Sequence, residues 1–185
     1  MGNKGLRLLL LLLMTVVLLP VWAQAEEGTG ITLPVFTETD CEWDDHGNLI
    51  SETAHDLNGQ PALNSRGFYR AEYTWDAHDN MLTEAYFGLN GEPVNGDAGY
   101  ARAEYTYDEK ERLVAEDRFA ADGSRADILG GYSYLRETWD DKHLLSIEYF
   151  NASGSLTRPI GGYARILNEY ELNGDTMTVT IAGKT

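Results

Sequence analysis

Cysteine is almost absent from this sequence of 185 residues, with Cys41 as its single example. One cysteine cannot form an internal disulfide bond, so packing and hydrogen bonds alone must stabilise the fold. Basic residues are also scarce: 14 lysines and arginines stand against 30 acidic residues, which gives a formal net charge of -16. A chain so acidic repels phosphate backbones and anionic lipid headgroups, and nucleic acid is therefore not expected as a partner.

Sequence signatures of common active sites are missing as well. The chain has no G-x-S-x-G nucleophile elbow and no glycine-rich phosphate loop. Its acidic turns lack the D-x-[DN]-x-[DN]-G spacing of a calcium loop. His46 and His78 take equivalent places in two turns, but lysines take that place in the next two, which disfavours a metal site. We expect no cofactor, no metal and no catalytic residue, and hence a protein that is not an enzyme.

Long hydrophobic runs are confined to the N-terminus. Lys4 and Arg7 precede an apolar stretch over residues 8–19, and Ala23-Gln24-Ala25 follows as an A-x-A cleavage box. That stretch is short for a membrane-spanning helix, which needs about 20 residues. Residues 1–25 are therefore predicted to be a secretory signal peptide, with an uncleaved N-terminal anchor as the alternative. The expected location is secreted, cell-surface or periplasmic, without membrane insertion after cleavage.

Internal repetition is what the sequence has in abundance. Three pairs of residues recur at a step of about 32: an aromatic residue with Asp, a turn-forming residue with Gly, and Gly with an aromatic residue. A fixed period of this length indicates a repeat architecture, in which each unit buries its apolar face against its neighbours. The three columns are Trp43-Asp44, Trp75-Asp76, Tyr107-Asp108 and Trp139-Asp140; Asn58-Gly59, Asn90-Gly91, Asp122-Gly123 and Ser153-Gly154; and Gly67-Phe68, Gly99-Tyr100, Gly131-Tyr132 and Gly162-Tyr163.

Each copy holds two aromatic-rich segments that are separated by a short polar break. The break, as in Asp45-His46-Gly47-Asn48, contains residues that favour tight turns. In the second segment, Leu113 stands six residues before Phe119, and the neighbouring copies repeat this spacing. An even offset keeps both side chains on one face of a strand, whereas on a helix they point about 120° apart. Strand hairpins are therefore predicted, rather than the helix hairpins of a tetratricopeptide-like array.

Charged residues alternate with these apolar columns and are expected on the opposite, solvated face of the strands. Arginine and glutamate columns would then form charge ladders across the sheet. The arginines are Arg70, Arg102 and Arg165, and the glutamates are Glu72, Glu104, Glu52, Glu84 and Glu116.

The predicted fold is all-β. We expect about four two-stranded repeats to form one elongated, twisted antiparallel sheet or open solenoid, with a C-terminal capping hairpin around Asn173-Gly174. Residues 26–35 are expected to be a flexible leader, and residues 36–185 a single β-repeat domain. The expected strands span residues 36–43, 49–56, 68–75, 81–88, 100–107, 113–120, 132–139, 144–151, 163–172 and 176–182.

The order of elements in one unit resembles the YD repeats of RHS-type bacterial surface proteins. Both have an aromatic-Asp dipeptide, a turn of the form x-x-Gly-Asn/Arg-Leu, a strand and then Asn/Asp-Gly. Residues 43–49 are the fullest match, and Tyr107-Asp108 with Arg112-Leu113 is the next. The units are also similar to longer Gly-Tyr-Ala-containing repeats of exported bacterial proteins. The resemblance covers most of residues 36–172 and implies an exported β-sheet scaffold without catalytic residues, although YD repeats are shorter than the present unit.

The aromatic residues of the Gly-aromatic column are the candidate ligand-binding residues. They recur at even spacing, and an evenly spaced row of rings can stack on sugars or grip a peptide. Arginines stand two residues beyond two of them. The alternative is that these rings fill a corner between the loops and the strands, which is a packing role. The candidates are Phe68, Tyr100, Arg102, Tyr132, Tyr163 and Arg165.

These features predict an exported, non-catalytic repeat scaffold or binding module that presents a polar and aromatic sheet surface to a glycan or protein. The acidic charge makes a neutral glycan or a basic peptide the expected partner. A small secreted hydrolase that uses a pair of carboxylates is the alternative function. With 30 acidic residues in the chain, proximity of two carboxylates would not by itself distinguish these functions.

Overall fold

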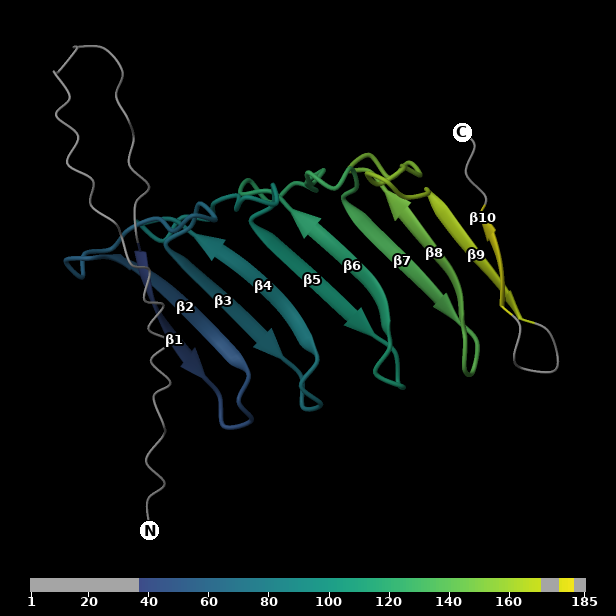
Figure 1. The fold of residues 1–185 in the computed structure, drawn as a ribbon, viewed down its shortest axis with the longest axis horizontal. Coiled ribbons are helices and arrows are strands. Elements are labelled where there is room, and N and C mark those ends of the chain that lie inside the picture. The colour runs from purple at the N-terminus through teal and green to yellow at the C-terminus, as the bar shows by residue number, and fades with distance from the viewer. Residues whose placement is uncertain (1–36, 171–176, 182–185) are drawn as a thin grey trace, which may run out of the picture. The chain divides into compact units, whose positions relative to one another are not determined.

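The computed structural model describes residues 37–170 and 177–181, and this part of the chain is all-β. Its ten strands form one open sheet in chain order, and each neighbouring pair is antiparallel (Figure 1). No helix in these residues is long and apolar enough to cross a membrane. The strands are β1 (Thr37–Trp43), β2 (Leu49–Asp56), β3 (Arg70–Trp75), β4 (Met81–Phe87), β5 (Arg102–Tyr107), β6 (Leu113–Phe119), β7 (Tyr134–Trp139), β8 (Leu144–Phe150), β9 (Arg165–Tyr170) and β10 (Met177–Ile181).

The all-β fold and the antiparallel sheet are thus confirmed, and the strands lie within two residues of their expected bounds in most cases. Three predictions fall outside the described residues. They are the signal peptide over residues 1–25, the leader over residues 26–35 and the Asn173-Gly174 turn of the C-terminal hairpin.

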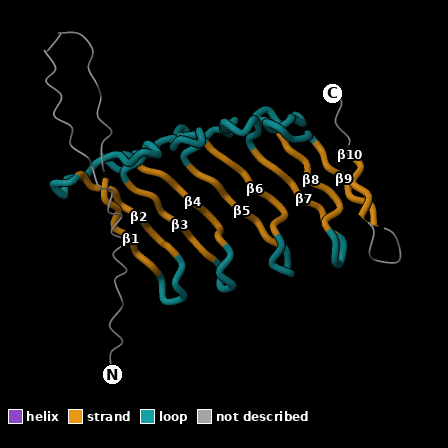
Figure 2. The backbone as a smooth tube through the Cα atoms, viewed as in Figure 1, coloured by secondary structure: helices purple, strands orange, loops and turns teal. Residues whose placement is uncertain are grey.

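Long and short hydrogen-bonded ladders alternate across the sheet. Within the hairpin β3–β4, six positions pair, from Arg70 opposite Phe87 to Trp75 opposite Met81. Between this hairpin and the next, only three positions of β4 pair with β5. The connections between hairpins are correspondingly long and lie along one edge of the sheet, which we call the loop edge (Figure 2). The short hairpin turns lie along the opposite edge, which we call the turn edge.

An aspartate builds each of the four turns after β1, β3, β5 and β7, which are the turns of the turn edge that the structure describes. In the turn after β3, Oδ1 of Asp76 accepts hydrogen bonds from the backbone N–H groups of His78 (2.8 Å) and Asn80 (3.0 Å). A side-chain oxygen that bonds the backbone two residues onward replaces a turn hydrogen bond. The aromatic-Asp column of the sequence therefore marks the start of each hairpin turn. The equivalent aspartates in the other turns are Asp44, Asp108 and Asp140.

The connections at the loop edge contain two tight turns each. In residues 88–101, the N–H of Gly91 bonds the carbonyl of Gly88 (3.0 Å) and the N–H of Gly99 bonds that of Gly96 (2.9 Å). Gly99 has φ of +94°, and a Cβ there would meet the next loop at 3.6 Å. Backbone hydrogen bonds join successive loops, from Asp97 to Arg66, from Leu129 to Ala98 and from Ile160 to Gly130. The loops therefore stack on one another in the same order as the strands.

One face of the sheet is buried beneath residues of these loops, and we call it the core face. Antiparallel partners share a face, so Ala71 and its partner Tyr86 lie on the same side. They are 0% and 2% exposed. Phe68, from the loop edge, stacks on Tyr86 with ring centroids 4.7 Å apart. Loop residues thus supply the second layer that a single sheet needs to bury its apolar side.

The other face carries the arginine ladders, and we call it the charged face. Arg70 forms an ion pair with Glu72, and its guanidinium lies 4.7 Å from the ring of Phe87. Arg102 repeats this arrangement over Phe119 at 4.4 Å. The arginines lie here as expected, but the phenylalanines were expected in the core. Their register places them opposite the arginines, so the facing predicted for the phenylalanine column is wrong. Leu49 and Met81, at the start of β2 and β4, pack against the core as expected.

Candidate functional site

The aromatic residues that were predicted to bind ligand differ in their exposure to solvent. Phe68 and Tyr100 are 1% and 8% exposed. The hydroxyl of Tyr100 donates a hydrogen bond to Oε1 of Glu84 at 2.5 Å. Tyr132 is half-buried, and Tyr163 is 42% exposed. The first two rings therefore fill the corner between loop and strand, as the packing alternative expected, while Tyr163 is open to solvent.

The two arginines of the predicted site lie on the charged face. Arg102 pairs with Glu104, and Arg165 pairs with Glu148. The Tyr100 hydroxyl, in contrast, bonds Glu84 on the core face. The six predicted residues therefore do not form one surface.

A buried carboxylate organises the centre of the core face. Glu84 is 9% exposed and accepts hydrogen bonds from three phenols, those of Tyr86 (2.9 Å), Tyr100 (2.5 Å) and Tyr105 (2.9 Å). Burial, reinforced by Glu84, raises the pKa of Tyr100 to about 12 and raises the pKa values of Tyr86 and Tyr105 far above their usual range. The phenols therefore remain protonated donors at neutral pH.

The neighbouring glutamates of this column are also on the core face. Glu52 accepts a hydrogen bond from the hydroxyl of Tyr73 at 2.6 Å. Glu116 is 7% exposed and pairs with Arg118, whose guanidinium lies 4.7 Å from the ring of Tyr132. The prediction that these glutamates lie on the solvated face is wrong. Phenols satisfy Glu52 and Glu84. Glu116 has its ion pair with Arg118, but its Oε1 and the Nε and Nη1 atoms of Arg118 have no hydrogen-bond partner among the described residues.

Two grooves, open to solvent, lie at the turn edge one repeat apart. Groove 1, of about 520 Å³, lies between the turn after β1 and the end of β3, and groove 2, of about 410 Å³, lies between the turn after β3 and the end of β5. Their principal residues correspond at a step of 32. Groove 1 is lined by Asp44, His46, Ile50, Tyr73, Trp75 and Asp76, and groove 2 by Asp76, His78, Leu82, Tyr105, Tyr107 and Asp108.

Each groove combines an aromatic ring, an exposed aliphatic side chain and carboxylates. Trp75 in groove 1 is fixed by a hydrogen bond from its indole Nε1–H to the carbonyl of Leu49 at 2.8 Å. Ile50 beside it is 37% exposed. Hydrogen bonds from Asn48 hold the pKa of Asp44 below its usual value, and those from Asn80 do the same for Asp76. These carboxylates therefore stay ionised at neutral pH.

Contacts between successive turns brace the turn edge. His46 Nδ1 lies 2.9 Å from Oδ1 of Asp79 in the next turn, and Asn48 donates to the same oxygen at 2.8 Å. Asp79 and Glu111 have left-handed backbones with φ of 65° and 62°, where the first turn has Gly47. A left-handed residue other than glycine costs about 1–2 kcal/mol. The carboxylate at this position contacts the preceding turn, and the first turn has none before it among the described strands.

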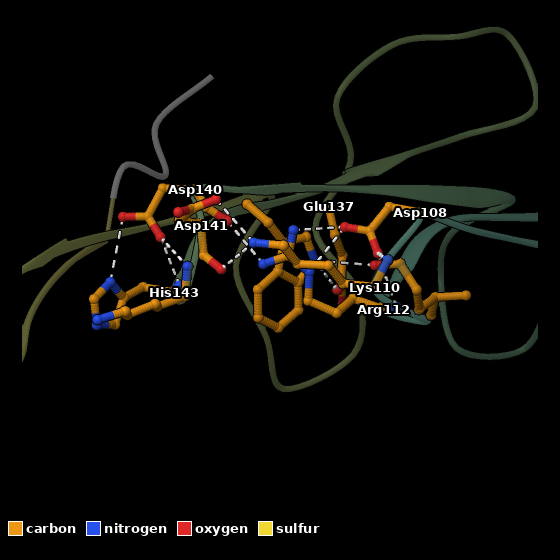
Figure 3. Close-up of polar contacts among 10 residues, drawn as sticks. Asp108, Lys110, Arg112, Glu137, Asp140, Asp141 and His143 are labelled. Carbon is orange, nitrogen blue, oxygen red and sulfur yellow. Dashed lines mark hydrogen bonds and ion pairs between the residues drawn. The ribbon is translucent and has the colours of Figure 1, made fainter.

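At the next step along the turn edge, basic side chains lie in the equivalent position (Figure 3). Arg112 donates from Nε and Nη2 to Oδ2 of Asp108, at 2.8 and 2.6 Å, and from Nη1 to the carbonyl of Asp140 at 2.7 Å. Its guanidinium carbon lies 4.9 Å from the ring of Trp139. Lys110 donates to Asp141 at 2.8 Å. This arrangement is a complete cation site made by the chain itself.

No protein-family model matches this chain, and no curated protein matches it either. Within the described residues, no group of three or more histidine, cysteine, aspartate or glutamate side chains is placed to hold a metal ion. The grooves were missed at the sequence level. A signal for them exists in the exposed Ile50 and Leu82, which follow successive turns at a step of 32.

Proposed function

We propose that this protein is a non-catalytic repeat scaffold that binds an extended ligand along the turn edge of its sheet. The observation that carries this proposal is the duplication of one groove, with equivalent lining residues, in adjacent repeats. Adjacent repeats are two strands apart, which is at least about 9.5 Å. An extended ligand that meets both grooves gains from linked contacts, because binding in the first raises the effective concentration at the second.

The chemistry of the grooves favours a neutral or cationic ligand. An aromatic ring beside an exposed aliphatic residue offers a stacking surface, and the carboxylates of Asp44 and Asp76 offer hydrogen-bond acceptors. The net charge of -16 disfavours polyanions. A neutral glycan or a basic peptide fits these properties.

The alternative function, a hydrolase with a carboxylate pair, is less well supported. A general acid must reach its substrate and have a raised pKa. Burial raises the pKa of Glu116, but this residue is 7% exposed and pairs with Arg118. The exposed carboxylates of the turns have lowered pKa values because backbone N–H groups bond them, as in Asp140. These turn carboxylates therefore lack the raised pKa of an acid catalyst. Burial raises the pKa of the half-buried Glu137, but this carboxylate accepts a hydrogen bond from Trp139 at 3.2 Å.

We also propose that the protein is exported, as its N-terminal sequence and its resemblance to YD repeats imply. Residues 1–25 carry the signal, and cleavage after Ala25 would leave Glu26 as the first residue. Expression in a bacterial host should yield an extracytoplasmic product that begins at Glu26. N-terminal sequencing or intact mass measures this directly, and a cytoplasmic product with Met1 retained would contradict it.

The binding function is tested by a screen of glycans and basic peptides against purified protein and a groove-filled variant. The variant Asn48→Arg/Asn80→Arg places in two turns the residue that the third turn has naturally. A control, Leu57→Arg/Leu89→Arg, adds the same charge at exposed positions of the loop edge. Ligands bound by the original protein and the control should be lost by the groove-filled variant. Equal binding by all three proteins, or turnover of a substrate, would contradict the proposal.

A further inference from the structure

We propose that grooves 1 and 2 each bind a guanidinium group, so that the ligand of the turn edge is a basic peptide with regularly spaced arginines. This inference rests on the proposed function and names its ligand. It derives from a comparison of three successive positions along one edge of the same sheet.

The third position shows what kind of group fits. There the guanidinium of Arg112 bonds the carboxylate of Asp108 and the backbone carbonyl of Asp140 (Figure 3). It also lies over the ring of Trp139. Ion pairing and stacking on an aromatic face are the two interactions for which arginine is best suited. The turn edge therefore contains one filled guanidinium site.

The same three groups recur in both grooves. One repeat earlier they are Asp76, Asp108 and Tyr107, and all of them line groove 2. Two repeats earlier they are Asp44, Asp76 and Trp75, and all of them line groove 1. Each groove is thus lined by equivalents of the three groups that contact Arg112: the aspartate carboxylate, the aspartate of the next turn and the aromatic ring.

The aromatic wall of groove 1 also has the orientation of the filled site. Nε1–H of Trp75 donates to the carbonyl of Leu49 at 2.8 Å, and Nε1–H of Trp139 donates to the carbonyl of Leu113 at 3.0 Å. These pairs are equivalent at a step of 64. An indole fixed in this way presents the same ring face to a cation in both positions.

One side chain distinguishes the grooves from the filled site. Asn48 and Asn80 stand where the third turn has Arg112. Each asparagine bonds the aspartate of its own turn, as Arg112 does, at 3.1 Å to Asp44 and 3.0 Å to Asp76. Asn48 also donates to Asp79 of the next turn at 2.8 Å. Asparagine has no guanidinium, however, whereas that of Arg112 lies over the ring of Trp139 in the next repeat. A guanidinium from a partner would complete the same set of contacts.

The charges of the lining residues favour binding of a cation in both grooves. Neither groove has a lysine or arginine among its lining residues. Groove 2 is lined by Asp76, Glu109 and Glu111 in addition to Asp108, which already pairs with Arg112. An arginine side chain satisfies these carboxylates and covers the aromatic ring at the same time. A neutral glycan satisfies the ring but leaves the negative charge uncompensated.

The spacing of the grooves defines the peptide. Two strands separate them, and paired strands lie about 4.8 Å apart, so the grooves are at least about 9.5 Å apart. The ladders between hairpins cover three positions each and end before the turn edge. A polyproline II peptide rises about 3.1 Å per residue with three residues per turn, so residues i and i+3 lie on one side about 9.3 Å apart. The sequence Arg-x-x-Arg in this conformation matches both grooves.

Calorimetric titration with acetyl-Arg-Pro-Pro-Arg-amide tests the inference, with the peptide in which citrulline replaces both arginines as a neutral control. We expect binding that weakens by at least about tenfold with citrulline, because the ion pair and cation–π contacts are lost. The Asn48→Arg/Asn80→Arg variant should no longer bind the arginine peptide, and the Leu57→Arg/Leu89→Arg control should bind it as the original protein does. Equal affinity for both peptides, or unchanged binding by the groove-filled variant, would overturn the inference.

A second variant opens the filled site, whereas the first variant fills the open grooves. Arg112→Asn uncovers Trp139, and a longer peptide with a third arginine, Arg-Pro-Pro-Arg-Pro-Pro-Arg, should then gain about tenfold in affinity over the original protein. Circular dichroism and melting confirm that the variant is folded. No gain by the folded variant contradicts the assignment. If a glycan binds and is displaced by groove filling while no peptide binds, the binding function stands and the guanidinium assignment fails.

Discussion

The two edges of the sheet carry equally regular columns of aromatic residues and use them differently. At the loop edge, Phe68 and Tyr100 are covered and become the core. At the turn edge, Trp75 and Tyr107 are half-buried and line grooves. The difference follows from the connecting segments, because the long loops fold back over the core face while the short turns do not. Repetition therefore identifies equivalent positions, but the neighbouring segment determines whether they are covered or line an open groove.

The largest expected effect comes from the loop edge. Phe68→Ala removes a ring that is 1% exposed and stacked on Tyr86, and such truncations cost about 3–5 kcal/mol of unfolding free energy. Tyr163→Ala, in the same column but 42% exposed, should cost less than about 0.5 kcal/mol. Urea denaturation of both variants measures the difference. Equal losses would contradict the division of this column into packed and exposed members.

Substitutions on the two faces of the sheet should also differ in how much unfolding free energy they remove. Glu84→Gln removes the charge that accepts hydrogen bonds from three buried phenols, and we expect a loss of about 1–3 kcal/mol. Glu104→Gln on the charged face removes an ion pair with Arg102, whose members are 42% and 44% exposed, and should cost less than about 1 kcal/mol. Chemical denaturation compares them, and a larger loss from Glu104→Gln would reverse the assignment of the faces.

Stability should fall in alkaline solution because of the core face. Burial raises the pKa of Tyr100 to about 12, whereas an unfolded tyrosine has a pKa of about 10. Below pH of about 10 both states keep the proton and stability is unaffected; above it the unfolded state releases the proton first, so stability declines as the pH rises toward 12. Urea midpoints measured from pH 8 to 11.5 test this. A midpoint that stays constant to pH 11.5 would contradict the raised pKa.

A smaller effect of opposite sign is expected in the connection between β6 and β7. Ser133 is 0% exposed, and its hydroxyl has no hydrogen-bond partner among the described residues. Ala101 stands at the equivalent position one repeat earlier and is 2% exposed. Ser133→Ala should therefore raise the unfolding free energy by about 1 kcal/mol, and Ala101→Ser should lower it. Thermal melting detects both shifts, and destabilisation by Ser133→Ala would show that its hydroxyl is bonded.

The strands and turns could be predicted from the sequence because local chemistry determines them. Asp76 and its equivalents build the turns through hydrogen bonds within a few residues. The even spacing of Leu113 and Phe119 identified a strand for a reason of backbone geometry alone. Features that depend on two to five neighbouring residues were therefore accessible without a structure.

The facing of the phenylalanine and glutamate columns could not be predicted in this way. Alternation separates two sets of side chains without saying which set the loops cover. Glu84 is charged and Phe87 apolar, yet the glutamate lies on the core face and the phenylalanine on the charged face. The cause is non-local: Tyr105, 21 residues away, contributes one of the donors that make burial of the carboxylate possible.

The sequence pointed to the aromatic column of the loop edge rather than to the turn-edge grooves for a related reason. Both aromatic columns were visible in the sequence, but only the structure shows that the loops cover one of them. The substitution of Arg112 for Asn80 and Asn48 was visible too. It acquired meaning only when Arg112 was found over Trp139, 27 residues further along the chain.

One measurement tests most directly whether the open grooves of the turn edge bind the peptide while the position that Arg112 fills does not. Trp75 and Trp139 are equivalent and have the same indole hydrogen bond, but Arg112 covers only Trp139. In a nitrogen-15 NMR titration of the original protein with acetyl-Arg-Pro-Pro-Arg-amide, the indole N–H resonance of Trp75 should shift to saturation while that of Trp139 stays in place. Equal shifts of both resonances, or no shift of Trp75, would contradict the account.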